Sequence, residues 1–196
     1  MSVVALIGSP RRDGNSAGLA GVVVEAAKKA GKTTRTFYLN DLTYRGCQAC
    51  YACKQGLDHC VLSDSATEIL EAVAAAEVVI FSSPVYFGDV TGQFKLFFDR
   101  AFSYFTPDYR TAANPSRLSP GKKLVFVQSQ GQPDPTFFDD LYPRYDRFFK
   151  RLGFSETHLI RVVGVAAPGE ALQRPEFVRE AENVAAGLFS QGEVDW

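Results

Sequence analysis

The chain has 196 residues, which is enough for one domain with a full hydrophobic core. Its 21 basic and 22 acidic residues give a net charge of −1, which argues against a nucleic-acid partner. No stretch reaches the ~20 apolar residues of a membrane span, and the N-terminal MSVVALIGSP is unlike a signal peptide, so we expect a cytoplasmic protein with no membrane partner.

Strand and helix patterns alternate along the whole chain. In chain order, the predicted elements are strand 2–8, a helix from 15 or 16 to 30, strand 33–39, helix 64–76, strand 77–83, helix 94–105, strand 122–129, helix 136–152, strand 158–165 and helix 177–188. The helix 94–105 carries a phenylalanine stripe at helical spacing and is expected to face the core. A kink is expected at Pro143 in the fourth helix, and the loop 106–121 is long enough to cover something.

Local signals set the ends of the first two helices. Asn15 or Ser16 is the predicted N-cap of the first helix, and Gly31 is its stop. Ser65-Ala-Thr-Glu68 matches a capping box at the start of the second helix.

The alternation of five strands with five helices predicts an α/β fold. We expect a doubly wound, five-stranded parallel sheet of order 2-1-3-4-5, with helices on both faces and right-handed crossovers. The whole of residues 1–196 is expected to form this single domain, and the cysteine-rich stretch at about 46–62 to be an insertion in it.

A sheet of this order binds ligands where the strand order reverses, between strands 1 and 3. The first loop at that point, GSPRRDGNS (residues 8–16), has small residues and two arginines, and it opens a helix. Backbone N–H groups at a helix N-terminus bind anions, so a phosphate is the natural ligand. The alternative is an ordinary capped turn. The spacing fits neither the ATP-type phosphate loop nor the dinucleotide turn.

The second loop, SSPVYFGDVTG (residues 82–92), places two aromatic residues at a strand end. Tyr86 and Phe87 lie between Pro84 and Gly88 and suit a flat ring that stacks, although a loop aromatic can also pack into the core. A phosphate on one loop and a ring on the next describe a mononucleotide, such as flavin mononucleotide (FMN) at the switch point of flavodoxin.

All four cysteines lie in one stretch with the spacing C-x2-C-x2-C-x6-C. They are Cys47, Cys50, Cys53 and Cys60. Two successive x2 gaps resemble the run that holds a cubane iron–sulfur cluster in ferredoxins. A zinc site, with His59 as a possible substitute ligand, and a dithiol–disulfide switch remain open. Because the stretch follows strand 2, we expect it at the same edge of the sheet as the first and second loops.

The motifs GSPRRDGNS, GCQACYAC and SSPVYFGDVTGQFKLFFDR together resemble the flavodoxin-like NAD(P)H-dependent FMN reductase superfamily, and within it the iron–sulfur flavoproteins of anaerobic microbes. The resemblance covers roughly residues 2–105. It implies FMN and a [4Fe-4S] cluster on the four cysteines. Where many relatives have an acidic pair after the fourth cysteine, this chain has Ser63-Asp64-Ser65. We interpret that departure as a changed helix cap and not as changed chemistry.

The resemblance also assigns residues to the FMN. The phosphate would be held by Ser9, Arg11, Asn15 and Ser16. The isoalloxazine ring would be lined by Pro84, Val85, Tyr86, Phe87 and Gly88, and its third side closed by the loop 129–131 with Ser129 and Gly131. No acid–base pair or nucleophile stands out, so the catalytic residues are unknown.

The function that follows is a redox flavoprotein joining one- and two-electron partners. The resemblance implies an electron donor such as ferredoxin or NAD(P)H, a small-molecule acceptor, and assembly as a homodimer or tetramer. The first alternative is an NAD(P)H-dependent reductase of FMN or quinones whose cysteines hold no cluster. A flavodoxin-type electron carrier would favour a more acidic surface, and a metal or redox sensor would require vestigial FMN loops.

Overall fold

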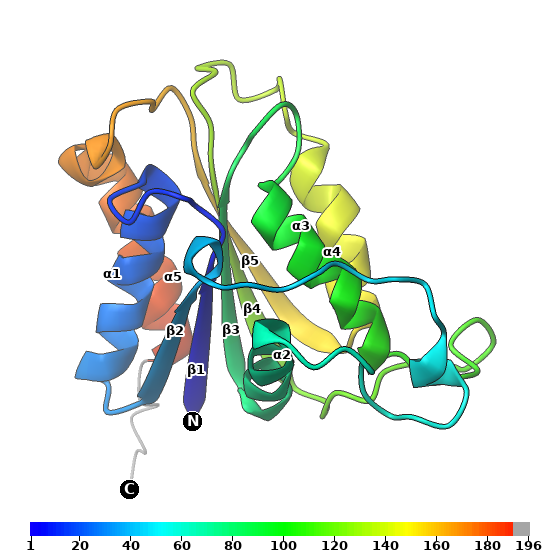
Figure 1. The fold of residues 1–196 in the computed structure, drawn as a ribbon. Helices are drawn as coiled ribbons and strands as arrows, with labels where there is room; N and C mark the ends of the chain where they lie inside the picture. The colour runs from blue at the N-terminus through cyan, green and yellow to red at the C-terminus, as the bar shows by residue number, and fades with distance from the viewer. Residues whose placement is uncertain (190–196) are drawn as a thin grey trace, which may run out of the picture.

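A computed structural model describes residues 1–189 of the chain (Figure 1). The strands are β1 (Ser2–Ile7), β2 (Thr33–Tyr38), β3 (Val78–Pro84), β4 (Lys122–Ser129) and β5 (Phe154–Val162). The α-helices are α1 (Asn15–Lys29), α2 (Ser65–Ala75), α3 (Gly92–Arg100), α4 (Leu141–Arg151) and α5 (Pro175–Phe189). Short 3₁₀ turns are η1 (Leu39–Asp41), η2 (Ala52–Lys54), η3 (Ala101–Tyr104) and η4 (Glu170–Gln173).

The five strands form one parallel sheet of order β2-β1-β3-β4-β5, which confirms the predicted topology. Ile7 at the end of β1 is in register with Ser82 of β3, and Pro84 at the end of β3 is in register with Ser129 of β4. The carboxyl ends of β1, β3 and β4 therefore lie side by side. The strand order reverses between β1 and β3, as expected for a site at this edge.

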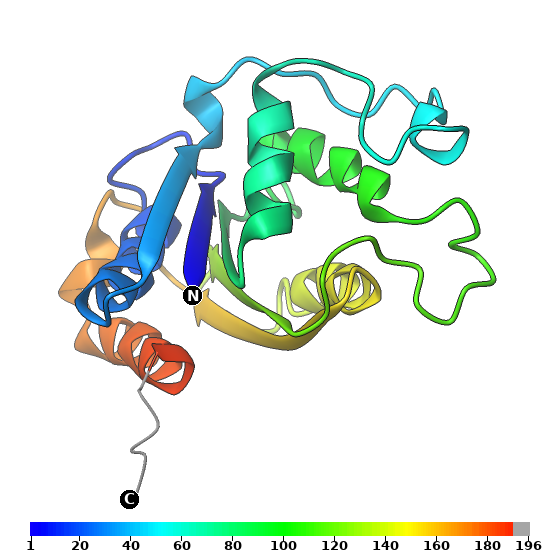
Figure 2. The ribbon, with the colours of Figure 1, turned by 90° about the horizontal axis from the view of Figure 1, so that it is seen from below.

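Helices cover both faces of the sheet. α1 and α5 lie on one face, and α2, α3 and α4 lie on the other (Figures 1 and 2). Alternate residues of a strand serve the two layers, as Ile80 packs with α1 and α5 whereas Phe81 packs on the opposite side. The second layer is strongly aromatic, and the Phe81 ring contacts both Phe94 and Phe149 there. The abundance of phenylalanine is therefore largely explained by this core.

The N-caps of the first two helices differ from the predicted ones, whereas Gly31, at φ 70° directly after the C-cap of α1, is confirmed as its stop. α1 is preceded by Gly14 and carries no side-chain cap, so neither Asn15 nor Ser16 is its N-cap. α2 is capped by Asp64, one residue before the predicted Ser65. The Asp64 carboxylate accepts from the N–H of Ala66 at 3.0 Å, and Thr67 Oγ1 accepts from the N–H of Asp64 at 3.3 Å. The interpretation of the Ser63-Asp64-Ser65 sequence as a changed cap is consistent with this geometry.

Three further boundaries differ from the prediction. α3 ends at Arg100 and continues as the 3₁₀ turn η3. α4 begins at Leu141, so Pro143 lies in its first turn, where the missing N–H removes no helical hydrogen bond and no kink is needed. β5 begins at Phe154, four residues before the predicted 158, because the strand runs alongside the whole of β4. None of the helices within residues 1–189 has both the length and the apolar character needed to cross a bilayer.

Candidate functional site

The loops that follow β1, β3 and β4 are tied together by hydrogen bonds. Gly8 N donates to Ser82 O at 2.7 Å, and Thr91 Oγ1 donates to Gly8 O at 2.8 Å. Val85 N donates to Ser129 O at 2.8 Å, which links the second loop to the third loop (residues 129–131). The structure thus brings the three segments predicted for FMN to one edge of the sheet.

The first loop is a tight turn built around Ser9. Ser9 Oγ accepts from Arg11 N at 3.1 Å and donates to Arg11 O at 2.9 Å, and Gly14 N also donates to Arg11 O at 3.1 Å. A β-carbon on Gly14 would lie 2.4 Å from Ser9 Oγ, so a larger residue at this position would displace the Ser9 hydroxyl from its hydrogen bonds to Arg11. The turn presents the start of α1 to the edge of the sheet.

The N-terminus of α1 has donors to offer. No side chain caps this helix, and Ser16 is fully buried in its first turn. Ser16 Oγ has no hydrogen-bond partner among residues 1–189. A buried hydroxyl without a partner is unfavourable, and a helix N-terminus attracts negative charge, so the first turn of α1 fits an anion such as a phosphate.

Asn15 makes contacts that the sequence does not reveal. Its Nδ2 donates to Ala167 O at 3.0 Å, and its Oδ1 accepts from Ala171 N at 2.8 Å. Gly169 N donates to Asp13 O at 2.8 Å in the same region. The loop between β5 and α5 therefore buttresses the first loop, and the amide of Asn15 is already committed to that loop. Because these partners are more than 150 positions apart in the chain, no local sequence pattern predicts the contacts.

Arg11 and Arg12, which are adjacent, have different environments. Arg11 is exposed, and within residues 1–189 its side chain makes one hydrogen bond, from Nη1 to Ala166 O at 3.3 Å. Arg12 is paired with Asp41, and its guanidinium lies 4.3 Å from the centre of the Tyr38 ring. Arg11 is therefore the arginine that remains available to a ligand at the first loop.

The second loop contains a tight turn. Tyr86 N donates to Asp89 O at 2.8 Å, and Asp89 N donates back to Tyr86 O at 3.2 Å. The two central residues, Phe87 and Gly88, have φ angles of 49° and 85°, which is natural for Gly88 and uncommon for a phenylalanine. Phe87 is fully exposed, and Tyr86 is 45% exposed. Neither ring is packed in the core, so the alternative prediction, that these loop aromatics pack into the core, is wrong.

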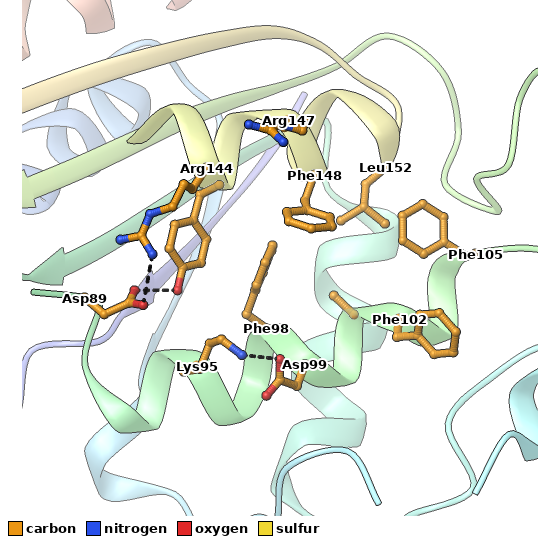
Figure 3. Close-up of a pocket in the computed structure, with 12 residues that line it drawn as sticks. Asp89, Lys95, Phe98, Asp99, Phe102, Phe105, Arg144, Arg147, Phe148 and Leu152 are labelled. Atoms are coloured by element: carbon orange, nitrogen blue, oxygen red, sulfur yellow. Dashed lines mark hydrogen bonds and ion pairs between the residues drawn. The ribbon is translucent and has the colours of Figure 1, made fainter. Parts of the chain in front are cut away.

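Asp89 anchors this turn to α4. Tyr145 Oη donates to Asp89 Oδ1 at 2.8 Å, and Arg144 Nη1 lies 3.6 Å from Asp89 Oδ2 (Figure 3). Burial raises the pKa of Tyr145 far above its ordinary value, and the hydrogen bond to Asp89 raises it further. The phenol therefore stays protonated and keeps donating to Asp89. The sequence analysis assigned no role to Asp89, Arg144 or Tyr145.

Buried polar groups continue along this edge of the sheet. Ser82 Oγ and Gln128 Oε1 are buried and have no hydrogen-bond partner among residues 1–189. Ser129 is also buried, whereas Gly131 is exposed in the third loop. Unpaired buried polar atoms near strand ends are suited to a polar ligand or to bound water.

A pocket of about 490 Å³ lies between α3 and α4. Figure 3 shows Phe98 and Phe148 facing each other across it, with Lys95, Asp99 and Arg147 around the rim. None of the residues predicted for FMN lines this pocket. It is therefore a separate, largely aromatic hollow.

The cysteine segment (residues 46–62) does not lie where we expected it. The chain leaves β2 at the carboxyl edge and then follows α3 toward its C-terminal end (Figure 1). Tyr44 Oη donates to Gln93 O at 2.6 Å near the start of α3, and a β-carbon on Gly46 would lie 2.8 Å from the Leu96 side chain midway along it. The segment thus runs away from the edge that carries the first and second loops.

The four cysteines line a single pocket of about 390 Å³ at the C-terminal end of α3. Asp99, Arg100, Phe102 and Ser103 form its other wall. α3 has nine residues and is therefore about 14 Å long. The expectation that the cysteines lie at the same edge of the sheet as the first and second loops is therefore wrong. Within one chain, the length of α3 separates the cysteine pocket from these loops.

The arrangement of the thiols constrains what they can hold. All four cysteines are free, with Cys47 and Cys50 exposed and Cys53 buried. Within residues 1–189, no three His, Cys, Asp or Glu side chains gather closely enough to hold one metal ion. Each thiolate of a four-iron cluster binds a different iron, so its ligands stand farther apart than those of a single ion. Within residues 1–189 the four thiols therefore share one pocket without forming a site for a single ion such as zinc.

His59 is turned away from this pocket. Its ring nitrogen Nδ1 lies 2.8 Å from Asp58 Oδ1, and its side chain is 68% exposed. It is not among the pocket-lining residues. The structure gives no support to His59 as a substitute ligand.

Cationic side chains fasten the cysteine segment to the rest of the protein. Lys54 Nζ donates to Phe102 O and Phe105 O, both at 2.8 Å, and lies 3.4 Å from Cys53 Sγ. Arg117 donates through Nη2 to Cys53 O at 3.0 Å. Arg117 belongs to the loop 106–121, which lies beside the segment (cyan and light green in Figure 2). That loop therefore supports the cysteine segment.

Asp64 and Arg100 form a buried ion pair below the segment. Arg100 Nη1 lies 2.9 Å from Asp64 Oδ2, and the Arg100 side chain is completely buried. Burial of Asp64 raises its pKa, but hydrogen bonds from Arg100 and from the N–H groups of Arg45 and Ala66 outweigh burial and hold the pKa below its ordinary value. Asp64 therefore stabilises α2 and the segment in its ionised form.

The lowered pKa of Asp64 predicts how its contribution varies with pH. A carboxyl whose folded pKa is depressed stabilises the protein above its unfolded pKa, about 3.9 for Asp, and the contribution is lost as the pH falls through the folded pKa. We expect the difference in unfolding free energy between wild type and Asp64→Asn to be constant from pH 7 to 5 and to shrink only below about pH 4. Denaturant titrations at each pH measure it, and a decline between pH 7 and 5 would contradict this origin.

Comparison with known proteins adds a family match. The family model described as NADPH-dependent FMN reductase matches residues 1–132. A curated relative, the iron–sulfur flavoprotein of Methanosarcina thermophila, is 37% identical over 101 residues, which are 52% of this chain and 52% of the relative. The iron–sulfur flavoprotein MJ1083 of Methanocaldococcus jannaschii is 36% identical over 101 residues, with the same 52% of each chain covered. The match thus spans about half the length of these curated relatives.

Solved structures resemble the whole fold. An FMN-dependent NADH-azoreductase from Bacillus anthracis, solved in complex with FMN, has a TM-score of 0.74 at 19% identity and covers 97% of this chain and 100% of its own. At this identity the similarity establishes the fold. Both loops and the cysteine segment fall inside the 132 residues that match the family model.

Proposed function

Because the chain belongs to the NADPH-dependent FMN reductase family, we propose that it is an FMN-binding oxidoreductase that also holds a [4Fe-4S] cluster and passes electrons between one- and two-electron partners. The resemblance to iron–sulfur flavoproteins supports the second cofactor. The observation that carries the proposal is that four free cysteines line one pocket, in a chain whose strand ends also offer an anion site.

The FMN phosphate is assigned to the first loop. The uncapped start of α1 and the unpartnered Ser16 hydroxyl provide neutral donors, and Arg11 provides a charged one. Ser9 shapes the turn through its two hydrogen bonds to Arg11. Asn15 acts by holding the loop between β5 and α5 against the first loop.

The isoalloxazine ring is assigned to the second and third loops. The Val85–Ser129 hydrogen bond fixes these loops relative to each other. The residues proposed for the ring site are Pro84, Val85, Tyr86, Phe87, Gly88, Ser129 and Gly131. Tyr86 and Phe87 are exposed and therefore free to stack on a ring placed outside the turn.

The cluster is assigned to Cys47, Cys50, Cys53 and Cys60. When bound, FMN supplies both one- and two-electron chemistry and the cluster supplies one-electron chemistry. Lys54 and Arg117 place positive charge near Cys53, which favours an anionic group there. The protein residues bind and orient both groups in a single domain over residues 1–196.

The proposed partners are an electron donor such as ferredoxin or NAD(P)H and a small-molecule acceptor. We also propose assembly as a homodimer or tetramer. Because α3 separates the two sites within one chain, a second copy would be a way to bring a cluster closer to a flavin. Sedimentation of the protein at several concentrations measures the assembly.

One preparation tests both cofactors. The protein is purified without oxygen and reconstituted with ferrous iron and sulfide; the flavin is released by heat for chromatography, and iron and sulfide are counted. FMN with about four irons per chain is the expected result. FAD, or no flavin after reconstitution with FMN, would overturn the assignment of the first and second loops.

The second candidate is an NAD(P)H-dependent FMN or quinone reductase whose cysteines hold no cluster. It is favoured by the family match itself, because the model that matches residues 1–132 is described as an NADPH-dependent FMN reductase. The same preparation discriminates the two functions. Anaerobic protein that binds FMN, takes up no iron and is rapidly bleached by NAD(P)H would establish this second function.

Arg11→Ala is expected to raise the dissociation constant of FMN by about 10–100-fold, because a charge-assisted contact contributes about 1.5–3 kcal/mol. Arg12→Ala is the matched control, since Arg12 is engaged by Asp41 and Tyr38. Quenching of flavin fluorescence measures both affinities. Equal losses in the two variants would show that general positive charge, and not Arg11, binds the phosphate.

A further inference from the structure

Lys54 places its ammonium group against the sulfur of a cysteine. Its Nζ lies 3.4 Å from Cys53 Sγ, which is within hydrogen-bond distance of a sulfur acceptor. The same nitrogen donates to Phe102 O and to Phe105 O, both at 2.8 Å. An ammonium group has three N–H donors, and these three acceptors use all of them. The contact between Nζ and Sγ therefore belongs to a complete set of hydrogen bonds.

The ammonium group is fixed in position by its surroundings. The two carbonyls belong to the 3₁₀ turn η3 and to the residue that follows it, and the centre of the Phe102 ring lies 4.2 Å from Nζ. Carbonyl groups at a helix end and the face of an aromatic ring both attract a cation. Lys54 also follows Cys53 directly in η2, so the sulfur and the ammonium group are carried by the same short turn.

The charge of Lys54 is available to this sulfur. Within residues 1–189 no carboxylate forms an ion pair with Lys54, whereas the charge of Arg100 is balanced by Asp64. Cys53 is buried, and two of the other cysteines are exposed. Solvent screens the interaction between buried charges much less than that between exposed ones. Lys54 therefore acts on the thiol at which a neighbouring charge has the largest effect.

We propose that Lys54 is a positioning residue for the cysteine-bound group, and that its ammonium donates a hydrogen bond to the Cys53 sulfur when that sulfur binds iron. This inference rests on the proposed cluster. Sulfur ligands gain negative charge on reduction, so a fixed cationic donor stabilises the reduced form more than the oxidised form. Lys54 thereby raises the reduction potential of the cluster, and it does so through one ligand, Cys53.

The hydrogen bond can be tested in the wild-type chain. Protein is produced with lysine labelled with ¹⁵N at Nζ only, reconstituted anaerobically with ferrous iron and sulfide, and reduced with dithionite to the paramagnetic cluster. Pulsed EPR is expected to show a ¹⁵N coupling to the cluster that disappears in Lys54→Met. A reduced wild-type cluster without this coupling would overturn the inference, whether or not the variant folds. A coupling that persists in Lys54→Met would also overturn it, because another lysine would be its source.

The potential is the second readout, because it tests tuning by the donor. Methionine is similar to lysine in length but has neither a charge nor an N–H donor. We expect Lys54→Met to lower the ratio of reduced to oxidised cluster at a fixed potential by about tenfold, or about 59 mV for one electron. Arg117→Met is the matched control, because Arg117 is also a cation that holds the segment but donates to Cys53 O and not to its sulfur. Equal shifts in the two variants would show that lost charge or loosening of the segment, and not the bond to sulfur, sets the potential.

The two levels of failure are distinguishable. Wild-type protein that takes up no iron and sulfide refutes the proposed cluster and this inference with it. Wild-type protein that holds the cluster but lacks the ¹⁵N coupling, or equal shifts of potential in the two methionine variants, refutes only the role of Lys54.

Discussion

Replacing Asp64 by alanine is expected to lower the free energy of unfolding by about 3–5 kcal/mol, because removing one partner of a buried ion pair leaves the other charge uncompensated. Arg100 is 1% exposed and has Asp64 as its anionic partner. The same substitution removes the N-cap of α2, which contributes about 1 kcal/mol by itself. Equilibrium unfolding in urea, followed by circular dichroism, measures the loss.

Two further variants separate the causes of this effect. Asp64→Asn keeps acceptors for the cap and for Arg100 but removes the charge, so its loss should be smaller. Glu25→Ala breaks the exposed pair with Lys28 and should change stability by about 0.5 kcal/mol or less. If Asp64→Ala behaved like Glu25→Ala, the buried pair would contribute nothing to the fold.

Replacing Cys50 by serine is expected to reduce the iron content from about four atoms per chain to less than one, while FMN remains bound. A serine hydroxyl is a poor substitute for a thiolate, and a cluster missing one of four ligands is readily lost. Cys50 is exposed, so its loss should not disturb the core. Iron and flavin are counted in the same anaerobically reconstituted sample.

Gln48 provides the matched control for this variant. It lies between Cys47 and Cys50 and lines the same pocket, and within residues 1–189 its side chain is hydrogen-bonded only to Gly46 O of its own segment. Gln48→Ala should retain full iron. Unchanged iron in Cys50→Ser, or equal losses in both variants, would remove the four-cysteine assignment.

The sheet could be predicted from sequence because its signals are local. Apolar runs such as 2–8 and 122–129 are buried on both faces, and a parallel sheet of this element order has few alternative topologies. The first and second loops could be placed for the same reason, since strand order alone brings them to one edge. No comparison tests the individual FMN-binding residues, which stay a prediction.

The remaining errors come from contacts between distant residues. Asn15 resembles a helix cap in sequence, but its amide is taken by Ala167 and Ala171. The cysteine segment was expected at the carboxyl edge because it follows β2, and its course along α3 depends on side-chain packing that no short motif encodes. Asp64 caps α2 in place of Ser65 because its carboxylate also neutralises Arg100.

The conformation of Phe87 has a consequence for evolution under selection for stability alone. A bulky residue at φ 49° carries a backbone strain of about 1–2 kcal/mol that glycine or asparagine would avoid, and a side chain that is 109% exposed returns no burial energy within the chain. Replacement of Phe87 by glycine or asparagine should therefore stabilise the isolated protein. We therefore expect Phe87 to serve a contact with a group outside the core of its own monomer. A thermostability screen of position 87 would select glycine and asparagine and would lose that contact.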